Sequence, residues 1–392
     1  MKILSVSGIL PVPGLIVSND FVFETARSYL RQFPSDEITI IRPTQYKTNI
    51  RKILTGKTDL KLIGRKDKLD IYNFSVWVFS FLSARKVRDL HALLAFTIIL
   101  FNRRKIKKIL DSHHFDVVHA QYIYPDAVLA WYIHKKYRIP YVVTTHKELY
   151  YFKFPVSRFI AKILLRNAFR ILPINHMNRK YFETMGLKNI EVLPLGFNSS
   201  FIRDQKKPAK DLIRIITVSS LLPYKNIKSI LYALSRLVQK YRISYTIVGN
   251  GPEMGNLQEI VQTNNLQDHV RFIEHIPHEE IADEIFRNDI FILTSYVETF
   301  GRVYFEAMAM GIPIICSENS GIWGYYKEME EGISVVHNDP DDIAANLEKL
   351  ITNQDLRLKI GIQGQQLVKN YTWDNIARRI HEIYVEMVAR KA

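Results

Sequence analysis

The chain has 392 residues, of which 47% are hydrophobic and 24% are charged, and its formal net charge is +15. This length exceeds what one hydrophobic core usually fills, which favours two domains. The apolar content excludes extensive disorder, because disordered chains bury too little apolar surface. The single cysteine, Cys316, excludes an internal disulfide and a cysteine-based zinc site, and we expect it to be a buried thiol in a reducing compartment.

The positive charge is concentrated in the N-terminal half. Residues 1–200 contain 32 Lys and Arg against 14 Asp and Glu, a net charge of +18, and the remaining residues contain 22 against 25, a net charge of −3. A field of one sign on one half indicates an anionic membrane or a polyanion as partner. The first residues are apolar, but Pro11, Pro13 and Gly14 interrupt them before a secretory or membrane helix develops, which favours a cytoplasmic location.

Short apolar runs alternate with helical periods along the whole chain. This alternation is typical of parallel βαβ units, and its restart near residue 213 predicts an α/β protein with two doubly wound parallel sheets. The expected strands are Ile3–Val6, Ile38–Ile41, Val117–His119, Tyr141–Thr144, Ile171–Leu172, Ile213–Val218, Tyr245–Val248, Val270–Phe272, Ile290–Leu293 and Pro313–Cys316.

A polar and basic stretch from Gly196 to Pro208 is typical of a connection between domains. We therefore place one Rossmann-like domain at 1–204, a second at 205–372, and a C-terminal helix at 373–392 that could cross back to the first domain. Within the second domain, Asp339 followed by Pro340 predicts the start of a helix. The C-terminal helix is predicted from the helical spacing of Ile376, Ile380, Ile383, Tyr384 and Met387.

The segment Ser295 to Ile314 predicts a strand end, a loop and a helix N-terminus. It follows the apolar run Ile290–Leu293, passes Gly301 and is helical up to Gly311. Backbone N–H groups at such a terminus suit a diphosphate, and a glycine lets a ligand approach the backbone closely. Glu298 and Glu306 could hold sugar hydroxyls and a ribose diol there, or they could be solvated charges at a helix end.

Glu298-Thr-Phe-Gly, Glu306-Ala-Met-Ala and Gly311-Ile-Pro together resemble the E-x7-E signature of family 4 retaining glycosyltransferases of the GT-B fold. Thr217 to Asn226 is similar to that family's entry into the donor domain, and Ile247-Val-Gly-Asn-Gly to its next strand and turn. The resemblance covers nearly the whole chain. It implies two Rossmann-like domains that face a cleft, with the C-terminal helix packing across.

The resemblance assigns roles in binding a nucleotide-sugar donor. Lys225 would contact the diphosphate, Glu298 the transferred sugar and Glu306 the ribose. The family often has an arginine where this chain has Ser220, and Arg302 could replace it or form a surface salt bridge. The donor site expected from these motifs comprises Gly14, Ser220, Lys225, Gly249, Thr299, Phe300, Gly301, Arg302 and Glu306, with Glu298 as a catalytic residue.

In the N-terminal, acceptor-binding domain, His146 follows a strand, at the end where open α/β sheets present ligand-binding groups. By resemblance His146 is the second catalytic candidate, and His119 is the second choice for contact with the acceptor; either could instead be a hydrogen-bonded structural histidine. Gly14 ends a first loop that resembles the one that reaches the donor phosphates. No carboxylate cluster completes a metal site, so the enzyme is expected to be metal-independent and to need no cofactor besides its nucleotide-sugar substrate.

Basic and apolar residues adjoin in the first half. The run Leu93–Phe101 precedes a basic cluster and is too short to span a bilayer, so it fits either a segment lying on an anionic membrane or a core helix with a solvated basic end. The basic residues are Lys47, Arg51, Lys52, Lys57, Lys61, Arg65, Lys66, Lys68, Arg103, Arg104, Lys105, Lys107 and Lys108.

Together these features predict a retaining glycosyltransferase with a lipid-linked or oligosaccharide acceptor, acting in cell-surface polysaccharide or glycolipid synthesis. We expect it in the cytoplasm, peripherally attached to the inner face of the cytoplasmic membrane. Two alternatives stay open: another GT-B enzyme, such as a nucleotide-sugar epimerase or a phosphorylase, and a non-catalytic polyanion-binding protein. Nucleic acid is not an expected partner, because no RNA-binding motif is present.

Overall fold

The structure is a computed structural model that describes residues 1–7, 21–47, 69–78, 92–146, 152–203, 211–274 and 276–390. The chain divides into two compact units. Unit 1 comprises Met1–Ile174, Asn178–Pro194 and Trp373–Ala392, and unit 2 comprises Asn175–Met177 and Leu195–Thr372. Gly14 and the basic residues between positions 51 and 68, named above as candidates, lie outside the described residues.

The chain enters unit 2 at Leu195, whereas the sequence analysis draws the boundary after residue 204. The segment that follows Leu195 belongs to unit 2 because its backbone is hydrogen-bonded there. The Phe197 N–H donates to the Tyr371 carbonyl at 3.2 Å, and the Arg203 N–H donates to the Ala309 carbonyl at 3.3 Å. The charged residues that suggested a linker therefore come after a segment that unit 2 already holds.

Unit 1 is built on a six-stranded parallel sheet, within the described residues, in the order β3-β2-β1-β4-β5-β6. This order is that of a doubly wound sheet, with a change of direction between β1 and β4. The elements of unit 1 are β1 Lys2–Val6, α1 Phe21–Gln32, β2 Glu37–Lys47, β3 Leu69–Val78, α4 Thr97–Ser112, β4 Val117–Ala120, α5 Val128–Tyr137, β5 Tyr141–Thr145, α6 Pro155–Arg166, β6 Arg170–Pro173, α7 His176–Thr184, which begins at the edge of unit 2, and α14 Trp373–Ala389.

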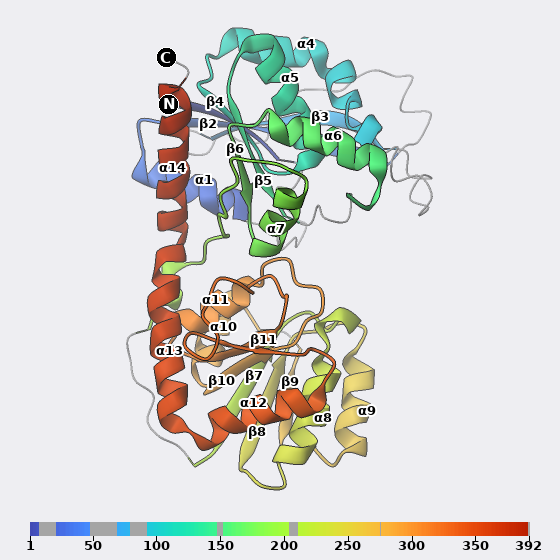
Figure 1. Cartoon of the computed structure of the whole chain (residues 1–392), viewed down its shortest axis with the longest axis vertical. Coiled ribbons are helices and arrows are strands. Elements are labelled where there is room, and N and C mark those ends of the chain that lie inside the picture. The colour runs from blue at the N-terminus through green and yellow to red at the C-terminus, as the bar shows by residue number, and fades with distance from the viewer. Residues whose placement is uncertain are drawn as a thin grey trace. The chain divides into compact units, whose positions relative to one another are not determined.

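Two helix layers cover the two faces of this sheet (Figure 1). Helices α4, α5 and α6 share one apolar core with alternate strand residues such as Val118 and Val143. The neighbouring residues of the same strands face the other way: His119 of β4 bonds Tyr384 of α14, and α14 in turn packs along α1. Because successive side chains of a strand point to opposite faces, the buried strands need a helix layer on each side.

Helix α14 is amphipathic as the sequence predicts. Its five predicted apolar positions, from Ile376 to Met387, are all buried. Polar contacts with α1 add to this packing: the Tyr29 hydroxyl lies 2.9 Å from Nδ1 of His381, and the Phe33 ring stacks on His381 at 3.6 Å between centroids. The C-terminal helix therefore completes the α1 side of unit 1.

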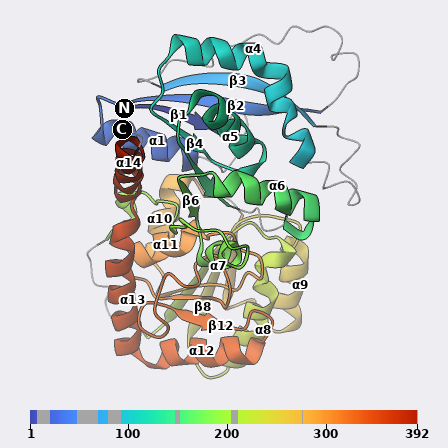
Figure 2. The same ribbon diagram turned by 45° about the horizontal axis from the view of Figure 1, so that its top comes forward.

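Unit 2 repeats the doubly wound plan with a six-stranded parallel sheet, within the described residues, in the order β12-β11-β10-β7-β8-β9 (Figure 2). All ten strands expected from the sequence are present; β3 and β12 were not predicted. The elements of unit 2 are β7 Ile213–Val218, α8 Ile227–Leu237, β8 Ile243–Val248, α9 Met254–Thr263, β9 Val270–Ile273, α10 His278–Phe286, β10 Ile290–Leu293, α11 Arg302–Ala309, β11 Ile314–Ser317, β12 Ile333–Val335, α12 Pro340–Thr352 and α13 Gln354–Val368.

Two local predictions in unit 2 are confirmed, the start of α12 at Asp339 and the burial of Cys316. The Asp339 side chain accepts the N–H groups of Asp341 and Asp342 and so caps α12. Cys316 is fully buried in β11. In the part of the chain that the structure describes, no helix has both the length and the apolar composition that a membrane span requires.

An added methyl group should have opposite effects on the free energy of unfolding at two helical glycines. In α13, a Cβ at Gly361 would lie 2.2 Å from the Gly311 carbonyl oxygen, whereas a Cβ at Gly255 in α9 would meet no atom within 4 Å. We expect Gly361→Ala to lower the free energy of unfolding of unit 2, because a backbone turn must shift. Gly255→Ala should raise it by about 0.5–1 kcal/mol, as alanine is the better helix former. Calorimetry of both variants tests this, and equal effects would contradict the packing of α13.

Candidate active site

The candidate donor site lies at the carboxyl edge of the unit 2 sheet, where the strand order changes direction. Strands β7 and β10 are neighbours there, and the chain winds outward from them on both sides. The loops that follow two such strands diverge and leave a crevice in which open α/β sheets bind ligands. The loop after β7 carries Lys225, and the loop after β10 carries Glu298.

An ion pair joins these two loops. The Lys225 Nζ lies 2.5 Å from the Glu298 Oε2, and each side chain is only 13% exposed. The Tyr296 N–H also donates to the Tyr224 carbonyl at 3.0 Å, so backbone and side chains hold the loops together. When a ligand binds beside such a partly buried ion pair, the two side chains can separate. The lysine can then pair with a phosphate, and the carboxylate can accept hydrogen bonds from sugar hydroxyls.

Helix α11 begins at this crevice. Its N-cap is Gly301, which has φ 76° and ψ 57°, a left-handed conformation that favours glycine. The Glu298 Oε1 accepts the Thr299 N–H at 3.1 Å. A Cβ at Gly321 would lie 2.4 Å from the Phe300 nitrogen, so a second loop packs directly against this turn. The start of α11 is thus held rigidly and presents the positive end of its dipole beside Lys225 and Glu298.

Glu306 and Arg302 pair with each other on α11. The Arg302 Nε lies 3.3 Å from the Glu306 Oε1, and the glutamate side chain is 10% exposed. The sequence analysis left open whether Arg302 serves the phosphates or forms a salt bridge. In this structure it forms a salt bridge, and its partner is the carboxylate expected to hold the ribose.

Other candidate residues of unit 2 take structural positions. The Phe300 ring is buried and stacks on Phe305 at 4.7 Å, so only its backbone could meet a ligand. Gly249 has φ +140°, and a Cβ there would lie 1.8 Å from the Ser219 carbonyl oxygen, so this glycine allows the β7 and β8 loops to approach. Ser220, the residue next to that contact, is exposed at the end of β7.

One residue that positions the site was not among the candidates. Asn226 is buried directly after Lys225 in a left-handed conformation with φ 55°, and its side-chain amide donates to the His337 carbonyl. The Thr294 hydroxyl donates to the Asn226 carbonyl at 3.2 Å. Asparagine tolerates a left-handed conformation better than most residues. An asparagine directly before a predicted helix is therefore the sequence signal that could have identified Asn226.

In unit 1, His146 lies directly after β5 and is held between two aromatic rings. Its ring stacks on Tyr122 at 4.6 Å and packs against Phe21 at 4.7 Å. The pKa of His146 is lowered to about 3, mainly by burial and also by the nearby His119, while a hydrogen bond with the Gln121 backbone acts in the opposite direction. At neutral pH the imidazole is therefore uncharged and suited to hydrogen bonding rather than to charge pairing.

His119 is a buried residue with both ring nitrogens in hydrogen bonds. Nδ1 lies 2.6 Å from the Tyr384 hydroxyl, and Nε2 lies 2.7 Å from the Thr144 hydroxyl. Burial lowers the pKa of His119 to about 3. Its contacts connect β4, β5 and α14, which agrees with the structural alternative stated for this residue.

A search of the described residues for three or more His, Cys, Asp or Glu side chains able to hold a metal ion gives no such group. The cations of the site in unit 2 are instead the ammonium group of Lys225 and the guanidinium group of Arg302. The arrangement can bind an anion through Lys225 and the N-terminus of α11, and it can hold hydroxyl groups through Glu298 and Glu306.

Two family models match the chain. The model described as glycosyl transferases group 1 matches residues 198–367, and the model described as glycosyltransferase family 4 matches residues 81–201. The first match contains all the candidate donor-site residues except Gly14. The second contains His119 and His146.

Individual relatives are distant but match over long stretches. An uncharacterized glycosyltransferase of Methanocaldococcus jannaschii is 23% identical over 74% of this chain and 80% of its own length. The alpha-monoglucosyldiacylglycerol synthase of Acholeplasma laidlawii is 22% identical over 76% of this chain and 81% of its own length. Among solved structures, HepE of Anabaena in complex with UDP has a TM-score of 0.71 at 17% identity and covers 98% of this chain and 100% of its own.

The two doubly wound units and the similarity to such structures define a GT-B fold. With both family models matched in order along the sequence, the chain belongs to the family 4 glycosyltransferases. It is therefore a glycosyltransferase, and the family inferred from Glu298 to Pro313 in the sequence analysis is confirmed.

The Lys225–Glu298 pair should be strongly coupled in stability. Lys225→Met leaves a partly buried carboxylate without its cation, and we expect it to cost about 1–3 kcal/mol. The double variant with Glu298→Gln should cost less than the sum of the single variants, giving a coupling energy above about 1 kcal/mol.

The exposed pair Arg179–Glu183, at 2.9 Å, is the matched control. Its double-mutant cycle should give only about 0.3–0.5 kcal/mol. Denaturant unfolding of both series measures the two coupling energies, and a Lys225–Glu298 coupling no larger than that of the control would contradict a tight pair.

The buried histidines predict acid sensitivity of unit 1. An unfolded histidine takes up a proton below about pH 6.5, whereas His119 and His146 stay neutral in the folded state until about pH 3. The unfolded state thus binds more protons than the folded state in this pH range. The free energy of unfolding is therefore highest above about pH 6.5 and decreases at lower pH, by up to about 1.4 kcal/mol per pH unit for each histidine.

Unfolding free energies measured between pH 7 and pH 5 test this. His119→Gln should reduce the slope with pH. Equal slopes for wild type and His119→Gln would show that His119 is protonated in the folded protein.

Proposed function

We propose that this enzyme transfers a sugar from a nucleoside diphosphate sugar to a lipid-linked or oligosaccharide acceptor in cell-surface polysaccharide or glycolipid synthesis. The observation that carries the proposal is the meeting of Lys225, Glu298 and the start of α11 at the point where the strand order of unit 2 reverses. One cation, one carboxylate and a helix N-terminus within one crevice fit a ligand that has a diphosphate and a sugar.

In the proposed complex each part of the donor has its own partner. The N-terminus of α11 and Lys225 hold the diphosphate and stabilise the negative charge that builds on it as the bond to the sugar breaks. Glu298, once released from Lys225, accepts hydrogen bonds from sugar hydroxyls. Glu306 accepts those of the ribose, with Arg302 holding its carboxylate in place.

We propose uridine as the base and a glycolipid as the class of product. Support for the base is the similarity to HepE, which was solved with UDP. Support for the product is the relative from Acholeplasma laidlawii, whose name says that it makes a glucosylated diacylglycerol. Retention of anomeric configuration rests on the family resemblance stated in the sequence analysis.

His146 is proposed as the second catalytic residue, and this assignment stays a prediction because it belongs to unit 1 and the donor site to unit 2. Its neutral imidazole, fixed between Tyr122 and Phe21, is suited to hydrogen-bond a sugar hydroxyl without placing a second charge at the reaction centre. We further propose that unit 1 works against the anionic inner face of the cytoplasmic membrane, where a lipid-linked acceptor is presented.

Nucleotide binding tests the donor site. A ligand of the native state raises the melting temperature, and a concentration of 100 times Kd adds about 2.7 kcal/mol. We expect UDP to produce such a shift and ADP and GDP to produce a smaller one. Lys225→Ala and Glu306→Ala should reduce the UDP shift, and the surface variant Lys359→Ala should not.

Turnover separates the reaction classes. Glu298→Ala and His146→Ala should each lower sugar transfer to an added lipid acceptor by about 100-fold or more, as expected for the loss of a group that acts in the transition state. Formation of an epimer or of a sugar phosphate in place of transfer would favour the alternative GT-B reactions. Near-normal rates in both variants would mean that the site lies elsewhere.

A further inference from the structure

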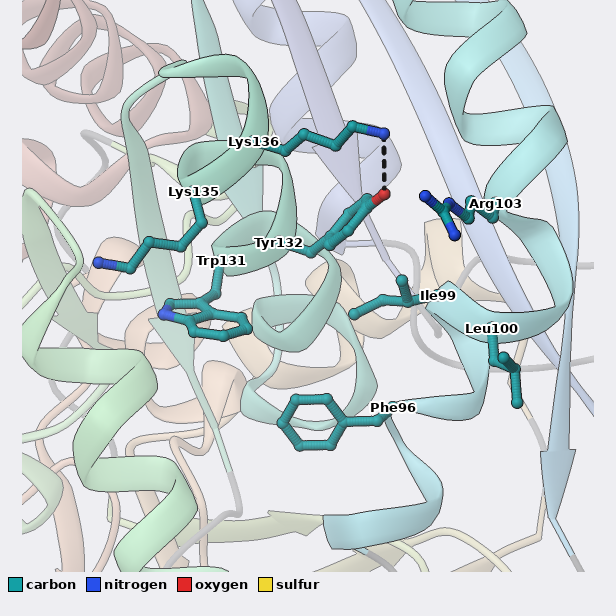
Figure 3. A pocket seen from close by; sticks show the side chains of 8 residues that line it. All are labelled: Phe96, Ile99, Leu100, Arg103, Trp131, Tyr132, Lys135 and Lys136. Carbon is teal, nitrogen blue, oxygen red and sulfur yellow. Dashed lines mark hydrogen bonds between the residues drawn. The ribbon is translucent and has the colours of Figure 1, made fainter.

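A hollow of about 520 Å³ lies between α4 and α5 of unit 1, apart from every residue assigned above to the donor or to catalysis. Its apolar part is made of Phe96, Ile99, Leu100 and Trp131, and the rings of Phe96 and Trp131 meet edge to face at 6.4 Å. Its other part is cationic, with Arg103 from α4 and Lys135 and Lys136 from α5 (Figure 3). The hollow is thus divided into an apolar half and a positively charged half.

Tyr132 stands between these cations. The Lys136 ammonium group donates to the Tyr132 hydroxyl at 3.4 Å, and Figure 3 shows Arg103 extending toward the same hydroxyl from α4. In the described part of the chain, Arg103 and Lys135 form no salt bridge with any carboxylate. Lys135 also lines the hollow, but Figure 3 shows its side chain beyond Trp131, extending away from Arg103 and Lys136. Arg103, Lys136 and the Tyr132 phenol therefore lie together at one side of the opening, which is a suitable arrangement for an anionic group with several oxygens.

The basic charge continues along α4 beyond the hollow. Arg104, Lys107 and Lys108 are exposed, and among the described residues none of them makes a salt bridge. Next to them, Leu100 is 72% and Phe101 is 50% exposed. Large apolar side chains that remain in solvent beside a cationic cluster are typical of segments that rest on a membrane surface.

Helix α6 repeats this combination. Val156, Phe159 and Ile163 are exposed in one stripe, at spacings of three and four residues, and Phe159 is 66% exposed. Arg158 and Arg166 flank the stripe. Helices α4, α5 and α6 cover the same face of the unit 1 sheet (Figures 1 and 2), so both apolar sets and the hollow belong to one helix layer.

We propose that the α4–α5–α6 layer is the membrane-docking face of this enzyme and that the hollow between α4 and α5 binds the phosphate head group of one anionic phospholipid. Arg103 and Lys136 hold the phosphate, Lys135 adds positive charge beside them on the membrane surface, and Phe96, Ile99, Leu100 and Trp131 contact the first part of the acyl chains. The inference rests on the proposed function only in its choice of a membrane as partner. It adds the face, the residues and the chemistry of the lipid.

The apolar half distinguishes this site from a binding site for nucleic acid. A nucleic-acid surface needs basic groups along a strand and aromatic faces for stacking, but it gains nothing from an exposed Leu100 or from the aliphatic stripe of α6. A phospholipid uses both halves, because its phosphate is anionic and the adjoining glycerol and acyl carbons are apolar.

Vesicle flotation with the full-length protein tests the proposal. Wild type should bind vesicles that contain phosphatidylglycerol and should not bind pure phosphatidylcholine vesicles. Lys135→Glu with Lys136→Glu should lower the partition coefficient by at least about 30-fold, since each basic group near an anionic surface contributes about a factor of five.

Lys188→Glu with Lys359→Glu changes the net charge equally at exposed positions outside the layer and is the matched control. It should lower binding by less than about threefold. Equal losses in both double variants would show that only bulk charge matters and would overturn the site. Absence of wild-type binding to phosphatidylglycerol vesicles would overturn the docking face as well.

Fluorescence locates the lipid in the hollow. Phosphatidylglycerol with brominated acyl chains should quench tryptophan emission, and Trp131→Phe should remove most of the quenched component, because Trp131 lines the hollow. Quenching that survives in Trp131→Phe would contradict the assignment. Displacement of the lipid by millimolar inorganic phosphate, or by single-stranded RNA, would assign the hollow to a free phosphate or to a nucleic acid instead.

The UDP melting shift, measured on the same variants, keeps this proposal separate from the proposed function. Lys135→Glu with Lys136→Glu should retain the full UDP shift, because neither residue belongs to the donor site. Vesicle binding without any UDP shift in the wild type would contradict the donor site and leave the docking face standing. A UDP shift without vesicle binding would contradict the docking face and leave the donor site standing.

Discussion

The ion pair between Lys225 and Glu298 is the constraint on which the site depends. It joins the loops after β7 and β10, the two strands at which the sheet of unit 2 reverses its order. The loops after these two strands lead in opposite directions, so without a contact between them they would not be held near one ligand. With it, the start of α11 and the end of the β7 loop are held close together, and in the proposed mechanism the free protein keeps the charges of Lys225 and Glu298 neutralised until a donor replaces them.

Unit 1 uses a different kind of constraint. One of its buried polar groups is the neutral imidazole of His119, which bonds Thr144 and Tyr384 and so connects two strands with the C-terminal helix. A charged histidine there would lack solvation, which is why burial lowers the pKa of both His119 and His146 to about 3. Among the described residues of unit 1, exposed basic side chains gather on α4 and α5, where the proposed lipid site is found.

The sequence predicted the elements that periodicity and capping define. Buried strands such as Ile290–Leu293 and the Asp339 cap were found because their signals are local. Strand β3 was missed, although Leu69, Ile71, Phe74 and Val76 include an alternating apolar pattern, because basic residues surround it and it lies at the edge of the described sheet. The Lys225–Glu298 and Arg302–Glu306 pairs could not be predicted as contacts, since they depend on how distant loops and one helix turn are packed.

The most direct test of this account is the position of a bound nucleotide in crystals of the enzyme grown with UDP. The account predicts density for the diphosphate at the N-terminus of α11, with Lys225 on its phosphates and Glu306 on its ribose, and with the Lys225–Glu298 contact broken or lengthened. A nucleotide bound elsewhere in unit 2, with that ion pair intact and Glu306 still paired with Arg302, would contradict it.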